Sequence, residues 1–132
     1  MHKAFHHSTK HKTLNILFIH YDPDIREEID EFLGTQQGTA FFARDTGHAI
    51  RILNETLIDL VVLKINNMRD AGILKYINDY YKDLEVFVMA SQEYDDIISV
   101  FSKGRYKLFQ QPLKISELKK KIEQKKTITN EY

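Results

Sequence analysis

The sequence predicts an α/β protein, built as a doubly wound parallel sheet with helices on both faces in three layers. Short apolar runs of β-forming residues alternate along the chain with segments of helical periodicity. The connecting loops are short, and we find neither an internal repeat nor a low-complexity linker. Strands that alternate with helices in this way are typical of a parallel sheet covered on both sides. The 132 residues suffice for one domain with a full core.

Composition excludes several classes of function. Lys plus Arg and Asp plus Glu both total 19, so we expect neither a nucleic-acid nor a membrane partner. The absence of cysteine removes disulfides and thiolate chemistry. No apolar run approaches the roughly 20 residues of a membrane span, and the first residues lack the apolar segment of a signal peptide. We therefore expect a soluble cytoplasmic protein.

The elements are expected in order between two tails, residues 1–12 and 127–132, which flank a domain at 13–126. The first strand covers 14–19, and Asp22 before Pro23 is typical of a helix N-cap. Further strands are expected at 39–44, 57–64, 85–90 and 106–110, and further helices at 46–53, 71–81, 91–102 and 116–125. The His- and Lys-rich first tail could chelate a metal through its imidazoles, but a solvated tail is favoured.

Residues that follow the strands are the candidates for a functional site, because ligands bind at the carboxyl ends of parallel strands. Residues 58–72, IDLVVLKINNMRDAG, form the central segment. Its apolar run predicts a strand buried on both faces, and Lys64 stands where that strand ends. The candidates at the other strand ends are His20, Tyr21, Asp22, Ala90, Ser91, Gln110 and Gln111.

Four fragments, in order and at matching spacing, resemble the receiver domain of two-component response regulators over residues 13–125. They are ILFIHYDPDIREEIDEFL, DTGHAIRIL, DLVVLKINNMRDAGILKYI and SKGRYKLFQQPL. The resemblance implies a flavodoxin-like, five-stranded sheet of order 2-1-3-4-5. It also implies a phosphoryl group accepted on an aspartate, with Mg²⁺ held by acidic residues after the first strand.

The residues that the resemblance places at this chemistry differ from the family pattern. Lys64 stands at the phosphoacceptor position, and a lysine cannot form the acyl phosphate. His20 and Tyr21 stand at the acidic pair, with Asp22 retained beside them. We therefore expect a degenerate pseudo-receiver that is not an enzyme, has no catalytic residue and binds no cofactor or Mg²⁺.

The other functional positions that the resemblance implies also carry residues that differ from the family pattern. The hydroxyl position falls on Ala90, and a shift of one residue would put Ser91 there. The aromatic switch position falls on Leu108, and the lysine of the family's Lys-Pro turn is Gln111. These losses indicate that the phosphoryl clamp is absent as well as the acceptor.

Lys64 itself has several interpretations. A desolvated lysine needs a partner, so Lys64 could pair with Asp22 and lock one conformation. Alternatively, its ammonium extends into solvent and does nothing specific. A Schiff-base nucleophile is a third reading, disfavoured because no compelling acid–base partner follows the other strands.

The function predicted from these observations is a phosphorylation-independent protein-interaction module in signal transduction. No output domain is expected after the last helix, so output must come through a surface. The family suggests the fourth helix, fifth strand and fifth helix, where the residues to test are Tyr94, Phe101, Tyr106 and Lys107. A homodimer through this face is plausible. The alternative is a phosphoryl-accepting switch that uses a displaced carboxylate, Asp22 or Asp70.

A lysine stripe on the last helix is better explained as a solvated face than as a nucleic-acid surface, because Glu117 and Glu123 interrupt it. The sequence leaves open the partner, the pathway, the oligomeric state and whether the chain is part of a longer protein.

Overall fold

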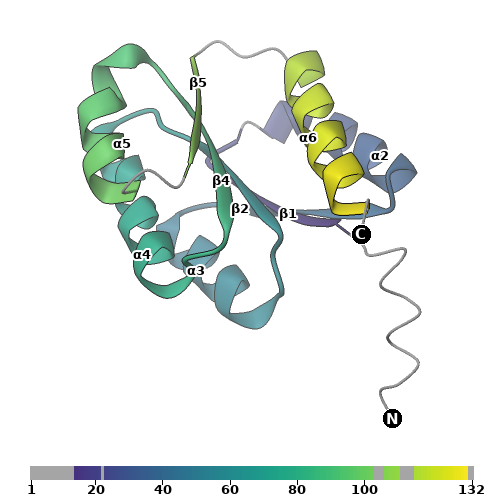
Figure 1. The fold of residues 1–132 in the computed structure, drawn as a ribbon, viewed down its shortest axis with the longest axis horizontal. Coiled ribbons are helices and arrows are strands. Elements are labelled where there is room, and N and C mark those ends of the chain that lie inside the picture. The colour runs from purple at the N-terminus through teal and green to yellow at the C-terminus, as the bar shows by residue number, and fades with distance from the viewer. Residues whose placement is uncertain (1–13, 22, 103–105, 111–114, 131–132) are drawn as a thin grey trace.

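A computed structural model describes residues 14–21, 23–102, 106–110 and 115–130 (Figure 1). Within these ranges, the side chains of 102, 108–110 and 125–130 are not described. The strands are β1 (Leu14–Ile19), β2 (Gly38–Ala43), β3 (Leu60–Lys64), β4 (Glu85–Ala90) and β5 (Lys107–Gln110). The α-helices are α2 (Arg26–Thr35), α3 (Thr46–Glu55), α4 (Gly72–Tyr80), α5 (Asp95–Ser102) and α6 (Ile115–Asn130). Three short 3₁₀ helices precede α2, α4 and α5: η2 (Pro23–Ile25), η3 (Met68–Ala71) and η4 (Gln92–Tyr94).

All strand pairs in the sheet are parallel, and the order is β2-β1-β3-β4-β5. The side chains of β2, β1, β3 and β4 are all described, and β3 lies between β1 and β4, with Val62 in register with Phe18 and Phe87. At the edge, β5 pairs with β4 through four residues, of which only Lys107 has a described side chain. The expected α/β class, with a parallel sheet and helices, is confirmed.

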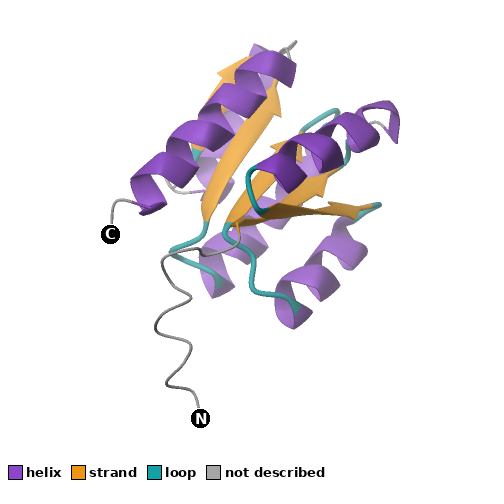
Figure 2. Cartoon of the chain, turned by 90° about the vertical axis from the view of Figure 1, so that its right-hand side faces the viewer, coloured by secondary structure: helices purple, strands orange, loops and turns teal. Residues whose placement is uncertain are grey.

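Alternate residues of the strands fill two separate cores, one on each face of the sheet. Leu60 and Val62 of β3 point to the face that α2 and α6 cover, where they join Ile29 and Ile122. Val61 and Leu63 point to the face of α3, α4 and α5. In Figure 2 the α2–α6 layer lies in front of the sheet and the other three helices lie behind it. Burial on both faces explains why β3 reads as a continuous apolar run.

Several boundaries differ from those expected from the sequence. β3 begins at Leu60 instead of residue 57, since Leu57 is 77% exposed and its carbonyl accepts a hydrogen bond from the Asn15 side chain. The segment before α5 forms η4 in place of a regular α-helical turn. Helix α6 continues to Asn130 and so includes most of the expected tail, because neither Gly nor Pro follows Pro112 to stop it.

Glycine at position 38 allows β1 and β2 to approach closely. A Cβ atom at Gly38 would lie 2.9 Å from the carbonyl oxygen of Leu14, the residue with which it is in register. By contrast, a Cβ atom at Gly34 in α2 would meet nothing within 4 Å. A glycine is therefore needed at the start of β2, whereas position 34 within α2 would accept a larger residue.

Candidate functional site

The carboxyl ends of the strands meet at one edge of the sheet, where the candidate residues were expected. Lys64 is the last residue of β3 and is half-buried, in register with Met89 of β4. Ala90 is the buried last residue of β4, followed by the half-buried Ser91. Gln110 ends β5 and pairs with Ala90. Asp22 and Gln111 lie outside the described residues, and Leu108 is described only by its backbone, opposite Val88.

The two residues after β1 turn in different directions. His20 has a φ angle of 66°, in the left-handed region that few residues other than glycine adopt, although histidine is among those enriched there. Its ring approaches the loop after β3, whereas Tyr21 packs against the core under α2 and α6. The structure therefore does not bring His20 and Tyr21 together as the resemblance implied for an acidic pair.

Tyr21 is half-buried and packs against the core. Its hydroxyl donates to the sulfur of Met89 at 2.7 Å, and its ring packs edge-on against Phe18 at a centroid distance of 5.5 Å. Burial raises the pKa of the Tyr21 phenol, because the phenolate would lose its hydration. The hydroxyl is thus directed toward a thioether and away from a role as a ligand for a hard cation.

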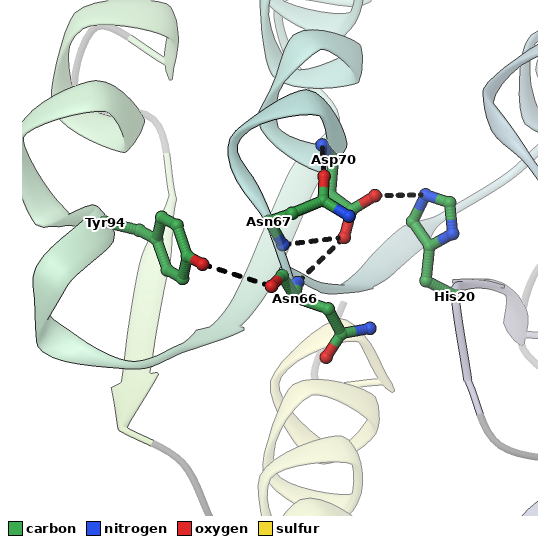
Figure 3. Close-up of polar contacts among 5 residues, drawn as sticks. All are labelled: His20, Asn66, Asn67, Asp70 and Tyr94. Carbon is green, nitrogen blue, oxygen red and sulfur yellow. Dashed lines mark hydrogen bonds and ion pairs between the residues drawn. The ribbon is translucent and has the colours of Figure 1, made fainter.

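His20 lies next to Asp70, in the segment between β3 and α4. His20 Nε2 is 3.4 Å from Asp70 Oδ1, a distance typical of an ion pair, without the alignment of a hydrogen bond (Figure 3). The imidazole side chain is 18% exposed. Asp70 is 8% exposed. Among the residues that the structure describes, it is the one charged residue that is buried. A buried carboxylate requires partners, and the contact with His20 supplies one of them.

The second oxygen of Asp70 binds the backbone of its own loop. Oδ2 accepts hydrogen bonds from the Asn66 N–H at 2.8 Å and from the Asn67 N–H at 3.2 Å. In return, Asn67 Oδ1 accepts from the Asp70 N–H at 3.2 Å, which completes a capping box at the start of η3. Oδ2 of Asp70 therefore accepts two backbone hydrogen bonds, and Oδ1 faces the His20 imidazole without a hydrogen bond.

Tyr94 extends this arrangement to η4. Its hydroxyl donates to the Asn66 carbonyl oxygen at 3.1 Å, as Figure 3 shows. Burial of the phenol raises the pKa of Tyr94, and the negative charges of Glu93 and Asp70 add to this effect. Together His20, Asn66, Asn67, Asp70 and Tyr94 form a polar network, hereafter the loop network, that joins the end of β1, the loop after β3, and η4.

The loop network was missed in the sequence analysis, apart from His20, Asp70 and Tyr94 as separate candidates. One of its contacts has a visible signal, because Asn67 followed three residues later by Asp70 has the spacing of a capping box. The contact between His20 and Asp70 has no local signal, since it depends on the φ angle of His20 and on the pairing of β1 with β3.

Lys64 forms no ion pair with any residue that the structure describes. Its pairing with Asp22 remains a prediction, because Asp22 lies outside the described residues. In the described ranges we also find no group of three or more His, Asp or Glu side chains that could hold a metal ion.

The residues expected on a partner surface differ in how far their side chains are exposed. Tyr94, Phe101 and Tyr106 are half-buried and pack against the core under α3, α4 and α5. Lys107 is exposed, and its ammonium lies 3.6 Å from Glu85. Val100 on α5, which was not singled out, is 67% exposed.

The lysine stripe of α6 also contacts another helix. Lys119 Nζ lies 2.8 Å from Glu28 Oε2 of α2 and 5.5 Å from the centroid of the Phe32 ring. At least this lysine stabilises the packing of α6 on α2. No helix among the described residues combines the length and apolar character needed to cross a membrane.

Comparison with known proteins places this geometry among solved receiver domains. The chain is similar to a response regulator receiver domain protein from Methanospirillum hungatei JF-1, with a TM-score of 0.72 and 15% identity over 91% of this chain and 98% of that one. The signal receiver domain of an HD domain-containing protein from Pseudomonas fluorescens Pf-5 gives a TM-score of 0.72 at 17% identity, over 92% and 100% of the two chains. The chain has the receiver fold.

A third similar structure is the chemotaxis protein CheY4 of Vibrio cholerae, with a TM-score of 0.69 and 16% identity over 86% of this chain and 98% of that one. No family model matches the sequence, and no curated protein matches it. Sequence identities this low establish the receiver fold and leave the chemistry of the strand ends to be argued from the residues themselves.

Proposed function

We propose that this chain is an atypical receiver domain that acts as a protein-interaction module in two-component-type signalling, without accepting a phosphoryl group. The observation that carries the proposal is Lys64 at the end of β3, on the carboxyl edge of a receiver-type sheet. An ammonium group cannot form an acyl phosphate, and its charge would oppose a divalent cation at the same place.

The residues after β1 support the same proposal. Mg²⁺ prefers oxygen ligands, especially carboxylates, and neither His20 nor Tyr21 supplies one. The Tyr21 hydroxyl is bound to Met89 inside the core. We therefore propose that the module works without Mg²⁺ or another cofactor.

The rival function is a phosphoryl-accepting switch that uses Asp70 or Asp22. Asp70 is a poor nucleophile in this geometry, because it is 8% exposed and Oδ2 already accepts two backbone N–H groups. Attack on a phosphodonor would break the capping box that begins η3. Asp22 lies outside the described residues, so the experiment below addresses it.

The partner that we propose is a protein, bound through the face of α5, β5 and α6, with a second copy of the chain as one such partner. Val100 on α5 is an exposed large apolar residue of this face, and Lys107 on β5 is one of its exposed basic residues. Sedimentation of Val100→Asp tests the homodimer. Leu57→Asp is the matched control, since Leu57 is similarly exposed but lies between α3 and β3.

Phosphoryl transfer is tested by incubating the protein with acetyl phosphate and Mg²⁺ and measuring its intact mass. We expect no phosphoryl adduct in the wild-type protein. An adduct that disappears in Asp70→Asn or Asp22→Asn would support the rival switch and identify its acceptor. An ordinary receiver domain treated in parallel shows that the phosphodonor is active.

A further inference from the structure

The loop between Ile65 and Ala71 has apolar anchors only at its two ends. Ile65 and Ala71 are fully buried, while residues 66–69 are exposed, Met68 to 61%. The backbone N–H of Ile65 donates to the Met89 carbonyl, which fixes the start of the loop to β4. Between these ends, the conformation of the loop depends on polar contacts, above all on the Asp70 carboxylate.

Asp70 connects this loop to the end of β1. Oδ2 holds the Asn66 and Asn67 N–H groups, and Oδ1 faces the His20 ring. A carboxylate with contacts at both oxygens has little freedom to rotate. A change at His20 is therefore transmitted to the position of the peptide group between Asn66 and Asn67.

The peptide group between Asn66 and Asn67 also contacts η4. Its N–H, that of Asn67, donates to Asp70, and its carbonyl oxygen, that of Asn66, accepts from the Tyr94 hydroxyl (Figure 3). Tyr94 ends η4, and α5 begins at the next residue, Asp95. A series of three contacts thus leads from the end of β1 to the start of α5. His20 contacts Asp70, Asp70 accepts from the Asn67 N–H, and the carbonyl of the same 66–67 peptide plane accepts from Tyr94.

We propose that His20, Asp70 and Tyr94 form a fixed latch, in which the contact of His20 with Asp70 sets the position of Tyr94 and of the entry to α5. The latch needs neither a phosphoryl group nor a metal ion. The consequence of the latch is that the α5 face is held in one arrangement. Only the importance of this face for signalling rests on the proposed function. The test of the latch involves no phosphodonor and no partner, so the latch and the proposed function can fail separately.

The direct test breaks the latch at His20 and observes Tyr94. His20→Asn suits the φ angle of 66°, because asparagine also tolerates the left-handed region, but its side chain is too short to reach Asp70 as the imidazole does. We expect the ring signals of Tyr94 to shift in an NMR spectrum of tyrosine-labelled protein. Amide exchange at Asn66 and Asn67 should become about two- to fivefold faster, the factor expected for the loss of one partly exposed charge contact.

His48→Asn is the matched control. His48 lies on α3, where its Nδ1 accepts from the Arg44 N–H, and it has no contact with the loop network. This variant should leave Tyr94, Asn66 and Asn67 unchanged. A His20→Asn protein whose Tyr94 ring signals stay at their wild-type positions would overturn the latch, even if Asn66 and Asn67 exchanged faster.

Tyr94→Phe tests the latch from the other end and keeps the ring that packs in the core. Because coupling between two sites is reciprocal, removing this hydroxyl should shift the ring signals of His20 and speed exchange at Asn66. Tyr76→Phe, which removes a hydroxyl bound to Asn54, should do neither. Unchanged His20 signals in Tyr94→Phe would overturn the latch, also if His20→Asn failed to fold.

Discussion

His20 Nε2 and Asp70 Oδ1 lie 3.4 Å apart and join the end of β1 to the loop after β3. These two residues come from segments that the sheet brings side by side through the parallel pairing of β1 with β3. Their contact means that the most buried carboxylate at this edge of the described structure is engaged by protein groups. This supports the proposal that the site holds one fixed arrangement.

Lys64→Asp alone should not restore phosphoryl transfer. The substitution returns a carboxylate to the end of β3, but His20 and Tyr21 still supply no acidic pair for Mg²⁺, and Ala90 supplies no hydroxyl. The expected result is no adduct by intact mass after incubation with acetyl phosphate and Mg²⁺. Efficient labelling of this variant would contradict the account of the degenerate site.

Asp70→Ala should lower the free energy of unfolding by about 2 kcal/mol, because two backbone N–H groups lose their acceptor and the capping box is broken. Urea denaturation measures the change. Asp30→Ala on the exposed face of α2 is the control and should stay within about 0.5 kcal/mol of wild type. Equal stability of the two variants would show that Asp70 is not a structural carboxylate.

Tyr21→Phe should alter the response to alkaline pH. Burial raises the pKa of Tyr21 in the folded state above the value of about 10 in the unfolded chain. The folded state is thus favoured below pH ~10, and this contribution is lost as pH rises, at about 1.4 kcal/mol per pH unit. Phenylalanine cannot ionise, so the stability of Tyr21→Phe relative to wild type should rise above pH ~10. Parallel curves for the two proteins up to pH 11 would contradict a buried phenol.

Gly38→Ala and Gly34→Ala should change stability in opposite directions. The first places a Cβ atom 2.9 Å from the Leu14 carbonyl oxygen and should destabilise the pairing of β1 with β2 by about 1–3 kcal/mol. The second adds a methyl group in open space within α2 and should stabilise the protein by about 0.5–1 kcal/mol. Thermal unfolding of the two variants compares them directly, and a stabilising Gly38→Ala would refute the close approach of the strands.

Much of the fold could be predicted from the sequence, because it depends on local patterns. The apolar run Leu60–Leu63 marks a strand buried on both faces, and β4 has the bounds that its sequence predicts. Patterning also places Lys64 and Ala90 at strand ends. The predicted start of β3 and the predicted end of α6 were wrong. The first depends on the exposure of Leu57, and the second on the absence of a stop signal after Lys125.

The site was less predictable, because strand ends fix positions and not side-chain directions. Tyr21 was expected beside His20 at the site, but it packs with Phe18 and Met89 in the core. The positive φ angle of His20 separates the two side chains, and no local pattern in HYDPD specifies it. The role of Asp70 likewise depends on a contact between residues that are fifty positions apart in the chain (70 − 20).

The most direct test of the central claim is a titration with beryllofluoride and Mg²⁺, a phosphoryl mimic, followed by the amide signals of the protein. If the strand ends accept no phosphoryl group, the signals of Lys64, Asn66 and Ala90 should stay unchanged up to millimolar ligand. Saturable shifts at these amides, with Mg²⁺ required, would contradict the account and establish a working acceptor site.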